Sequence, residues 1–230
     1  MSQPPSDRFL PGCLLLDLET SQSGQILKIG AARDCHSFLR TGRFDIQQAL
    51  RDLDVFAADA ICLVGHNVLQ HDLAVLTKHQ PELVLLRLPV VDTLYLSPIC
   101  FPENPYHRLV KDYKLVADSL NDPVADSRLA GTLMLEEIAS LKGLAQTAPD
   151  FFRCLYLLLG NETDADPRLA AGMRMVFEAA ADCVPQTNAD ECLQRLSTVV
   201  GTQACSTCVR GLTNGGEGDR ETASGCSGDQ

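Results

Sequence analysis

The chain contains no tryptophan among its 230 residues, and aromatic residues make up only 5% of it. Any stacking against nucleic-acid bases would therefore use phenylalanine, tyrosine or histidine. No apolar run approaches the roughly 20 residues that a transmembrane helix requires. The start, MSQPPSDRF, also lacks the charged segment and apolar stretch of a signal peptide. These absences predict a cytoplasmic protein that does not bind membranes.

Basic residues are scarce as well. The 19 lysines and arginines stand against 30 aspartates and glutamates, which gives a net charge of −11. Proteins that bind duplex nucleic acid without sequence preference carry the opposite excess, because they neutralise phosphates. More than half of the acidic excess falls after residue 142. The charge thus argues against strong nonspecific duplex binding, whereas bound divalent cations would offset much of the excess in residues 1–142.

The chain has ten cysteines but no secretion signal, so a disulfide framework is not expected. Four of them lie in apolar, strand-like runs and are expected to be buried: Cys13, Cys35, Cys62 and Cys100. The pair Cys205 and Cys208 forms the one CxxC motif of the sequence. Because no histidine follows His107, a zinc site at this pair would need a further cysteine after residue 180. Zinc binding by Cys205 and Cys208 is left open as the less favoured alternative.

Apolar patterns along the chain predict strands that come first and then alternate with helices. Strands are expected over residues 13–18, 25–33, 36–40, 60–64 and 89–96, the last running into a helix. Helices are expected over residues 45–60, 71–79, 113–120 and 126–140. In the last of these, the residues expected to face inward are Leu129, Leu133, Met134 and Ile138.

This order of elements predicts an α/β protein with a mixed five-stranded sheet flanked by helices. We expect one domain over residues 1–145 and a helical extension over residues 146–205, with helices at 151–159, 169–181 and 189–200. Residues 206–230 are rich in glycine, serine, threonine and acids. This composition cannot form a packed core, so we expect the tail to be disordered.

Acidic residues occur at the ends of several predicted elements. Asp17 and Glu19 close the first apolar strand, and residues two apart in a strand point to one face. Two carboxylates on one side of a buried strand repel each other unless a cation lies between them. Asp72 and Asp126 stand at predicted helix starts, where a helix N-cap is the alternative role. Hard divalent cations bind such carboxylates, and pairs of them serve phosphodiester hydrolysis.

Four segments resemble the motifs of DnaQ-like 3′–5′ exonucleases of the DEDD superfamily: LLLDLET at 14–20, ILKIGA at 26–31, VGHNVLQHDL at 64–73 and NDPVADSRL at 121–129. This family implies a ribonuclease-H-like fold and removal of nucleotides from the 3′ ends of single-stranded DNA or RNA. It also implies two Mg²⁺ or Mn²⁺ ions held by Asp17, Glu19, Asp72 and Asp126. Residues 89–126 further resemble the exonuclease-like domain at the front of some RecQ-type helicases, so a helicase or another repair protein is an expected partner.

The last motif departs from the family at the position of the general base. The DEDDh group has a histidine five residues before the last aspartate, and the DEDDy group has a tyrosine four residues before it. This chain has Asn121 and Asp122 at those places. An amide can orient a water molecule but cannot accept its proton, and losing a general base typically costs about 10²–10⁴-fold in rate. We therefore expect a weakened exonuclease.

Two rival functions remain beside the weakened exonuclease. The first is a noncatalytic module that binds a strand end or a partner protein without hydrolysing it. The second is a structural component of a larger assembly that docks through residues 148–200. The residues do not separate DNA from RNA as the substrate, because contacts to the 2′-hydroxyl cannot be placed.

Contacts to the substrate are expected from a few residues. The resemblance places Thr20 at the terminal nucleotide, and Asn67 would position Asp72 through a hydrogen bond. The one basic and aromatic cluster contains Tyr106, Arg108 and Lys111, a mixture that suits single-stranded nucleic acid. An alternative of equal weight is that these residues form a solvent-exposed loop surface.

Three further polar residues are candidates to replace the missing general base. His107 lies in the loop before the last motif, and a surface histidine is its favoured alternative. His71 precedes Asp72, but a helical residue there is expected to face away from its neighbour's metal. Asp122 is expected to cap the turn before Pro123 rather than to act on water.

Overall fold

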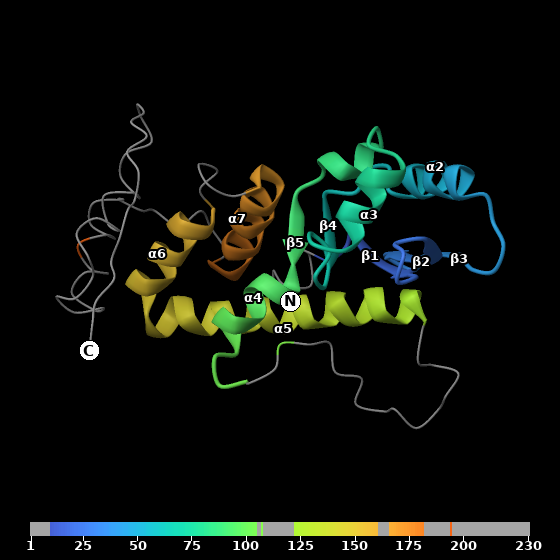
Figure 1. The fold of residues 1–230 in the computed structure, drawn as a ribbon. Coiled ribbons are helices and arrows are strands. Elements are labelled where there is room, and N and C mark those ends of the chain that lie inside the picture. The colour runs from blue at the N-terminus through green and yellow to red at the C-terminus, as the bar shows by residue number, and fades with distance from the viewer. Residues whose placement is uncertain (1–9, 105–106, 108–121, 161–165, 182–193, 195–230) are drawn as a thin grey trace, which may run out of the picture.

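The computed structural model describes residues 10–104, 107, 122–160, 166–181 and 194 (Figure 1). Its strands are β1 (Cys13–Thr20), β2 (Ile26–Arg33), β3 (His36–Arg40), β4 (Cys62–Gly65) and β5 (Val90–Asp92). Its helices are α2 (Ile46–Phe56), α3 (Asp72–His79), α4 (Thr93–Cys100), α5 (Pro123–Thr147), α6 (Pro149–Leu159) and α7 (Pro167–Ala181), with a 3₁₀ helix η1 (Val84–Arg87). The helix expected over 113–120, the helix expected over 189–200 apart from residue 194, the tail and the Cys205–Cys208 pair lie outside the described residues.

The five strands form one mixed sheet in the order β3-β2-β1-β4-β5. β2 runs antiparallel to both of its neighbours, β1 and β3, whereas β4 runs parallel to β1 and β5. The predicted α/β class, with a mixed five-stranded sheet, flanking helices and a C-terminal helical region, is confirmed. This arrangement is compatible with a ribonuclease-H-like fold, and it puts β1 at the centre of the sheet.

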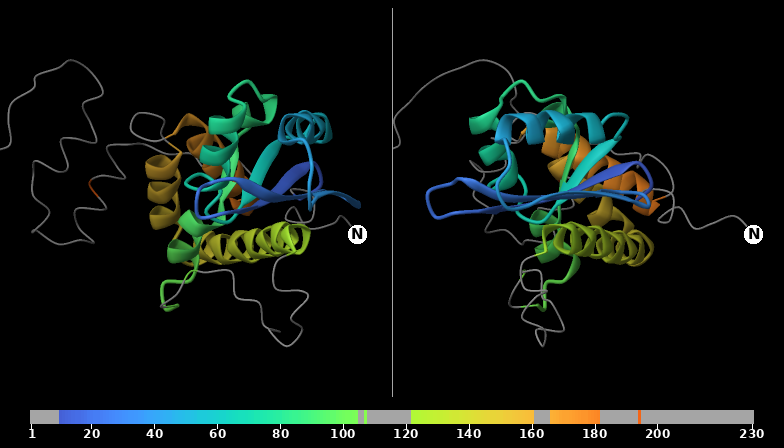
Figure 2. Two further views of the ribbon diagram at one scale, coloured as in Figure 1. Left: turned by 45° about the vertical axis from the view of Figure 1, so that its right-hand side comes forward. Right: turned by 90° about the vertical axis from the view of Figure 1, so that its right-hand side faces the viewer.

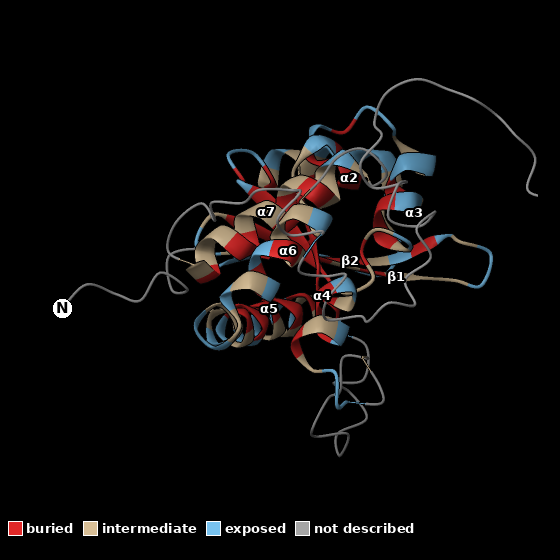
Figure 3. Ribbon diagram, turned by 90° about the vertical axis from the view of Figure 1, so that its left-hand side faces the viewer, coloured by how far each residue is buried: buried red, intermediate tan, exposed pale blue. Residues whose placement is uncertain are grey.

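The side chains of β1 alternate between two hydrophobic clusters, which explains its continuous apolar sequence. Leu14, Leu16 and Leu18 pack with residues of α2 and α3. Cys13 and Leu15 pack with residues of α5, α6 and α7. In Figure 2, α2 and α5 accordingly lie on opposite sides of the sheet. Figure 3 shows the buried residues concentrated between the helices and the sheet.

Helix α5 extends beyond the predicted range at both ends, and its start is fixed by Asp122. The Asp122 carboxylate accepts hydrogen bonds from the N–H groups of Val124 and Ala125, and Pro123 occupies the first turn. The helix therefore begins three residues before the expected position. Met134 and Ile138 are buried as predicted, whereas Leu129 and Leu133 are only half-buried.

The C-terminal helices belong to the same hydrophobic core as the sheet. Helix α5 continues through the expected boundary at residue 145, and Phe152 of α6 and Phe177 of α7 share a cluster with the sheet residues. Helix α7 approaches β5 so closely that a Cβ atom at Gly172 would lie 2.0 Å from the carbonyl oxygen of Val90. Glycine at this position lets the helix lie directly on the strand backbone.

Cys13, Cys62 and Cys100 are buried, as the sequence predicted. Cys35 is exposed, so its predicted burial is wrong: it lies in the tight turn between β2 and β3, next to Asp34 in a left-handed conformation (φ 53°). In the described part of the chain, no helix is both long enough and apolar enough to cross a membrane.

Candidate metal centre

Three acidic side chains from distant parts of the sequence meet above the centre of the sheet. Asp17 and Glu19 lie two residues apart on β1 and therefore share one face of the strand. Asp126 comes from the first turn of α5. One ligand atom from each of these three carboxylates lies within 4.8 Å of the other two. Three of the four predicted metal ligands are thus brought together.

Gly30 makes this meeting possible. It pairs with Asp17 across the β1–β2 ladder, and α5 begins directly over it. A Cβ atom at position 30 would lie 2.3 Å from the backbone carbon of Pro123. The absence of a side chain therefore sets how near the first turn of α5, and with it Asp126, comes to β1.

Negative charge on these three carboxylates is unfavourable because they lie close together. The pKa of Asp17 is raised to about 7, first by burial and then by the charges of Asp72, Asp126 and Glu19. Like charges held this close are stabilised by a cation between them. Oxygen ligands from carboxylates suit Mg²⁺ and Mn²⁺, so the donor set fits a hard divalent ion.

Asp72 lies beside this cluster, and its carboxylate accepts a hydrogen bond from a backbone N–H group. It is only 3% exposed, and its Oδ1 accepts a hydrogen bond of 2.6 Å from the N–H of Leu18. The pairing of β1 with β4 runs from Cys13 to Leu15, so the N–H of Leu18 finds its acceptor in Asp72. Burial raises the pKa of Asp72, and its charge is the second largest cause of the raised Asp17 pKa.

The alternative N-cap roles of Asp72 and Asp126 do not apply. The residue at the N-cap of α5 is Asp122, which leaves Asp126 free of that task, and the N-cap of α3 is His71. Asp122 thus has the capping role that the sequence predicted, with the helix rather than a turn as its target.

His71 faces the acidic cluster, contrary to the expectation that it would point away. It precedes the first residue of α3 and is not part of the helix. Its Nδ1 lies 3.5 Å from Oδ2 of Asp72, and its Nε2 lies 3.0 Å from the hydroxyl of Thr20. The contact with Asp72 raises the pKa of His71, and the charges of Asp17 and Glu19 act in the same direction.

The structural role of Asp92, which is 0% exposed, was not predicted from the sequence. Its carboxylate accepts hydrogen bonds from the N–H groups of Asn67, Leu69 and Leu94. It therefore fixes the loop between β4 and α3 and caps α4 at the same time. The only available signal was an aspartate between an apolar strand and a helix start.

Asn67 supports the site through its backbone. It adopts a left-handed conformation (φ 62°), and its carbonyl oxygen accepts a hydrogen bond of 3.1 Å from the N–H of His71. In the described part of the chain, its side chain makes no hydrogen bond with Asp72, so the predicted contact is absent.

The other predicted site residues lie away from the cluster or outside the described residues. Tyr106, Arg108, Lys111 and Asn121 belong to the second group. His107 lies at the end of β4, where its backbone is hydrogen-bonded to the ring of His66. Its Nδ1 is buried and has no hydrogen-bond partner among the described residues. Among those residues, His71 is the histidine whose charge lowers the Asp17 pKa.

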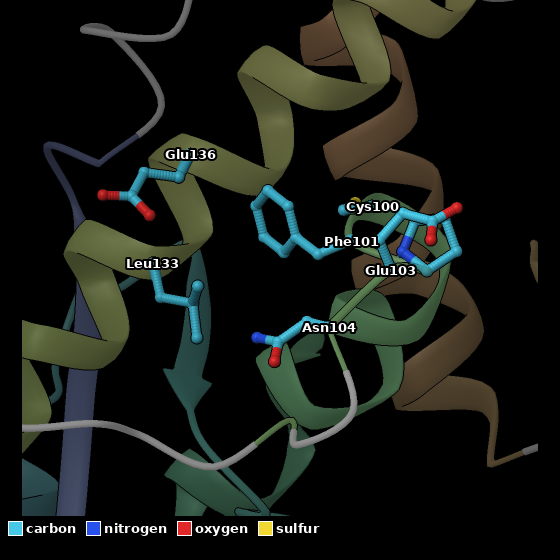
Figure 4. Close-up of a pocket in the computed structure, with 7 residues that line it drawn as sticks. Cys100, Phe101, Glu103, Asn104, Leu133 and Glu136 are labelled. Atoms are coloured by element: carbon cyan, nitrogen blue, oxygen red, sulfur yellow. The ribbon is translucent and has the colours of Figure 1, made fainter.

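A cavity of about 640 Å³ opens between the end of α4 and the outer side of α5 (Figure 4). Phe101, Glu103 and Asn104 line one side, and Leu133 and Glu136 of α5 line the other. None of the predicted site residues lines this cavity, so it is separate from the acidic cluster.

The described site thus consists of three clustered carboxylates, the buried Asp72 beside them, and the His71–Thr20 pair at their edge. No protein-family model matches the chain, and no curated protein or solved structure matches it significantly.

Proposed function

We propose that this chain is a metal-dependent 3′–5′ exonuclease, or an exonuclease-like domain, that acts on the ends of single-stranded nucleic acid. The observation that carries the proposal is the meeting of Asp17, Glu19 and Asp126 within 4.8 Å above the central strand. Carboxylates held this close repel one another, and a divalent cation between them removes that repulsion. Their spacing and their oxygen donors therefore support the binding of a hard cation.

The cofactors proposed are two Mg²⁺ or Mn²⁺ ions. Asp17, Glu19 and Asp126 would hold one, and Asp72 would contribute to the second from beside the cluster. When bound, such ions activate water and stabilise the leaving oxygen in phosphodiester hydrolysis. The chain itself supplies the oxygen ligands, a half-buried setting and the close approach of α5 to β1.

The substrate proposed is the 3′ end of single-stranded DNA or RNA. Thr20 follows Glu19 directly and ends β1, so it is the described residue best placed for the terminal nucleotide. Tyr106, Arg108 and Lys111 are proposed to contact the strand further back. A helicase or another repair protein is the proposed partner, on the resemblance of residues 89–126 alone.

A noncatalytic strand-binding module is the second candidate, and Asn121 favours it. The family's histidine base is replaced there by an amide, which cannot accept a proton at neutral pH. Metal and strand binding would then persist without turnover.

Release of mononucleotides from a 5′-labelled single strand tests the two functions together. The assay compares wild type, Asp17→Ala and Asn121→His with Mg²⁺ and with Mn²⁺. Glu82→Ala, which removes an exposed acid away from the cluster, is the matched control. An exonuclease gives a ladder from the 3′ end that disappears in Asp17→Ala, persists in Glu82→Ala and strengthens in Asn121→His.

The remaining outcomes separate the rivals. Activity in Asn121→His but not in wild type would show an intact metal site without its base, which favours the binding module. If neither wild type nor any variant releases mononucleotides, the exonuclease is rejected and a structural component of a larger assembly remains.

A further inference from the structure

A second surface cavity lies at the C-terminal end of α2 and has a volume of about 680 Å³. None of the residues that line it belongs to the acidic cluster. In Figure 1, α2 lies at the opposite end of the molecule from α6. We call this cavity the α2 groove, and the lining residues that matter here are Arg51, Asp54, Val55, Asp59, Val84 and Leu88.

The α2 groove exposes large apolar side chains. Val55 is 76% exposed and Val84 is 63% exposed, the two highest values among the exposed large apolar residues of the described chain. Leu88 is half-buried in the same cavity. Single exposed apolar residues are ordinary, whereas several that line one hollow mark a contact with another molecule.

Asp54 holds the two walls of the groove together. Its carboxylate accepts hydrogen bonds of 3.0 Å from the N–H of Val84 and 2.8 Å from the N–H of Leu85, which attaches η1 to α2. The groove is therefore a preformed feature of the fold. Because the Asp54 charge is already used by these backbone donors, Arg51 and Asp59 are the charged lining residues that can serve a partner.

Arg51 and Asp59 are both exposed, and they stand four residues before and four residues after Val55. Side chains at this spacing follow one face of a helix, and all three line the groove although α2 ends at Phe56. Gln48 accepts two hydrogen bonds from the Arg51 guanidinium, of 3.3 and 2.8 Å, which orders this group and leaves its other N–H donors for a partner.

The order of these side chains, a base, an apolar residue and an acid, is complementary to itself. A twofold axis through Val55 would bring Arg51 of one copy opposite Asp59 of the other, and the same contact would recur on the other side of the axis. Twofold dimers use one surface patch on both subunits, so their contacts occur in such reciprocal pairs. An unrelated partner would need this charge order by chance, whereas a second copy carries it.

We propose that the α2 groove binds a second copy of this chain. The two α2 helices lie antiparallel, with Val55, Val84 and Leu88 of both copies in the centre and two Arg51–Asp59 pairs at the edges. The contact is small, so the dimer is weak, with a Kd on the order of 10–100 µM. This association goes beyond the function proposed above and does not depend on it.

Sedimentation velocity of the full chain, between about 1 and about 500 µM on either side of this Kd, tests the proposal. The variants are Arg51→Glu, Asp59→Arg and Val55→Glu, and the two charge variants are also measured as an equimolar mixture. Arg153→Glu makes the same charge change at an exposed position of α6 and serves as the control. Melting temperatures show whether each variant is folded.

Wild type is expected to shift from monomer to dimer over this range. Arg51→Glu and Asp59→Arg should each weaken association by about 10-fold, because two like-charge contacts replace two opposite ones. Val55→Glu should abolish it, because it places two acids at the centre of the contact. The mixture should recover it, because both contacts between the two variants then join an acid to a base. Arg153→Glu should behave as wild type.

Recovery in the mixture would also show that both charge variants are folded and that the two positions face each other across the axis. The proposal is overturned if wild type stays monomeric at the highest concentration, in which case the groove does not bind a second copy. It is equally overturned if the charge variants associate as wild type does, if Arg153→Glu loses as much as they do, or if their mixture associates no better than either alone.

Discussion

Two regions of the molecule hold carboxyl groups whose pKa is raised first by burial, and the two regions differ in the groups that surround the carboxyl. At the metal centre, burial and three neighbouring acids raise the Asp17 pKa to about 7. At the contact between α4 and α5, burial is the largest cause that raises the Glu137 pKa to about 8, and the charges of Asp92 and Glu136 act in the same direction. Asp17 sits among acids that a cation can neutralise together. Glu137 is 0% exposed and accepts one hydrogen bond of 2.7 Å from Ser97.

The different surroundings of the two carboxyl groups indicate what neutralises each of them, a proton at Glu137 and a metal ion at Asp17. The second carboxylate oxygen of Glu137 is buried without a partner among the described residues, so a proton is the simplest way to neutralise it. The carboxylate oxygens of Asp17, Glu19 and Asp126 converge on one point, which is the arrangement of ligands that a metal ion needs. A raised carboxyl pKa therefore marks a metal site only where other ligands converge on it.

The largest expected effect is at Glu137. The folded state keeps the Glu137 proton up to about pH 8, whereas the unfolded chain releases it near its ordinary pKa of 4.5. Stability present below pH 4.5 is therefore lost as the pH rises toward 8, by up to about 4 kcal/mol. Glu137→Gln should remove this loss and be more stable than wild type at pH 8. Urea unfolding from pH 4 to 9 measures it, and parallel curves for the two proteins would refute it.

Asp17→Asn should stabilise the metal-free protein and abolish its response to metal. In EDTA at pH 8, relief of burial and repulsion should raise the free energy of unfolding by about 2–3 kcal/mol. Wild type should gain about 2.7 kcal/mol from Mn²⁺ at 100 times its Kd, and the variant should gain nothing. Thermal melts with and without Mn²⁺ measure both effects. Glu137→Gln is the control, since it should keep the response to Mn²⁺.

Gly30→Ala should damage the metal centre through packing rather than through charge. The added methyl group would collide with the backbone of Pro123 and push the first turn of α5, with Asp126, away from β1. We expect a loss of about 1–3 kcal/mol in stability and weaker Mn²⁺ binding. Gly143→Ala, in the same helix with open space around the position, should instead stabilise by up to about 1 kcal/mol. Equal behaviour of the two variants would contradict this account.

The smallest expected effect is that of Ser97→Ala. It removes the hydroxyl that donates to Glu137 and should cost about 1 kcal/mol at pH 5. The cost should disappear in the Glu137→Leu background, where the serine has no carboxyl partner. A double-mutant cycle by urea unfolding measures this coupling, and additive losses would show that the hydrogen bond contributes nothing.

The sequence predicted the elements whose pattern is local. The apolar run of β1, the alternation of its acids and the succession of strands and helices along the chain all follow from residue type and spacing. The position of Asp126 near Asp17 came from motif resemblance, and its physical cause, the bare backbone of Gly30 under Pro123, is a long-range packing contact. No local pattern encodes such a contact.

Two features of the site were not predicted, for the same reason. The hydrogen bond that Asp72 accepts from the N–H of Leu18 depends on where β4 stops pairing with β1. His71 was predicted to face away because it was placed on the helix, whereas α3 begins one residue later. A shift of one residue at a helix start rotates a side chain by about 100°, which reverses the conclusion.

The length of α5 has a practical consequence for anyone shortening the protein. The helix carries Asp126 in its first turn and Glu137 about 16 Å further along, and its later turns pack against α6 and α7. Cutting the chain at residue 145 would remove the last two residues of α5 together with α6 and α7, and would uncover the side of β5 on which Gly172 rests. Helix α5, which carries Asp126 of the acidic cluster, would then lose its packing against α6 and α7. A shortened chain that keeps this packing should therefore include α7, which ends at Ala181.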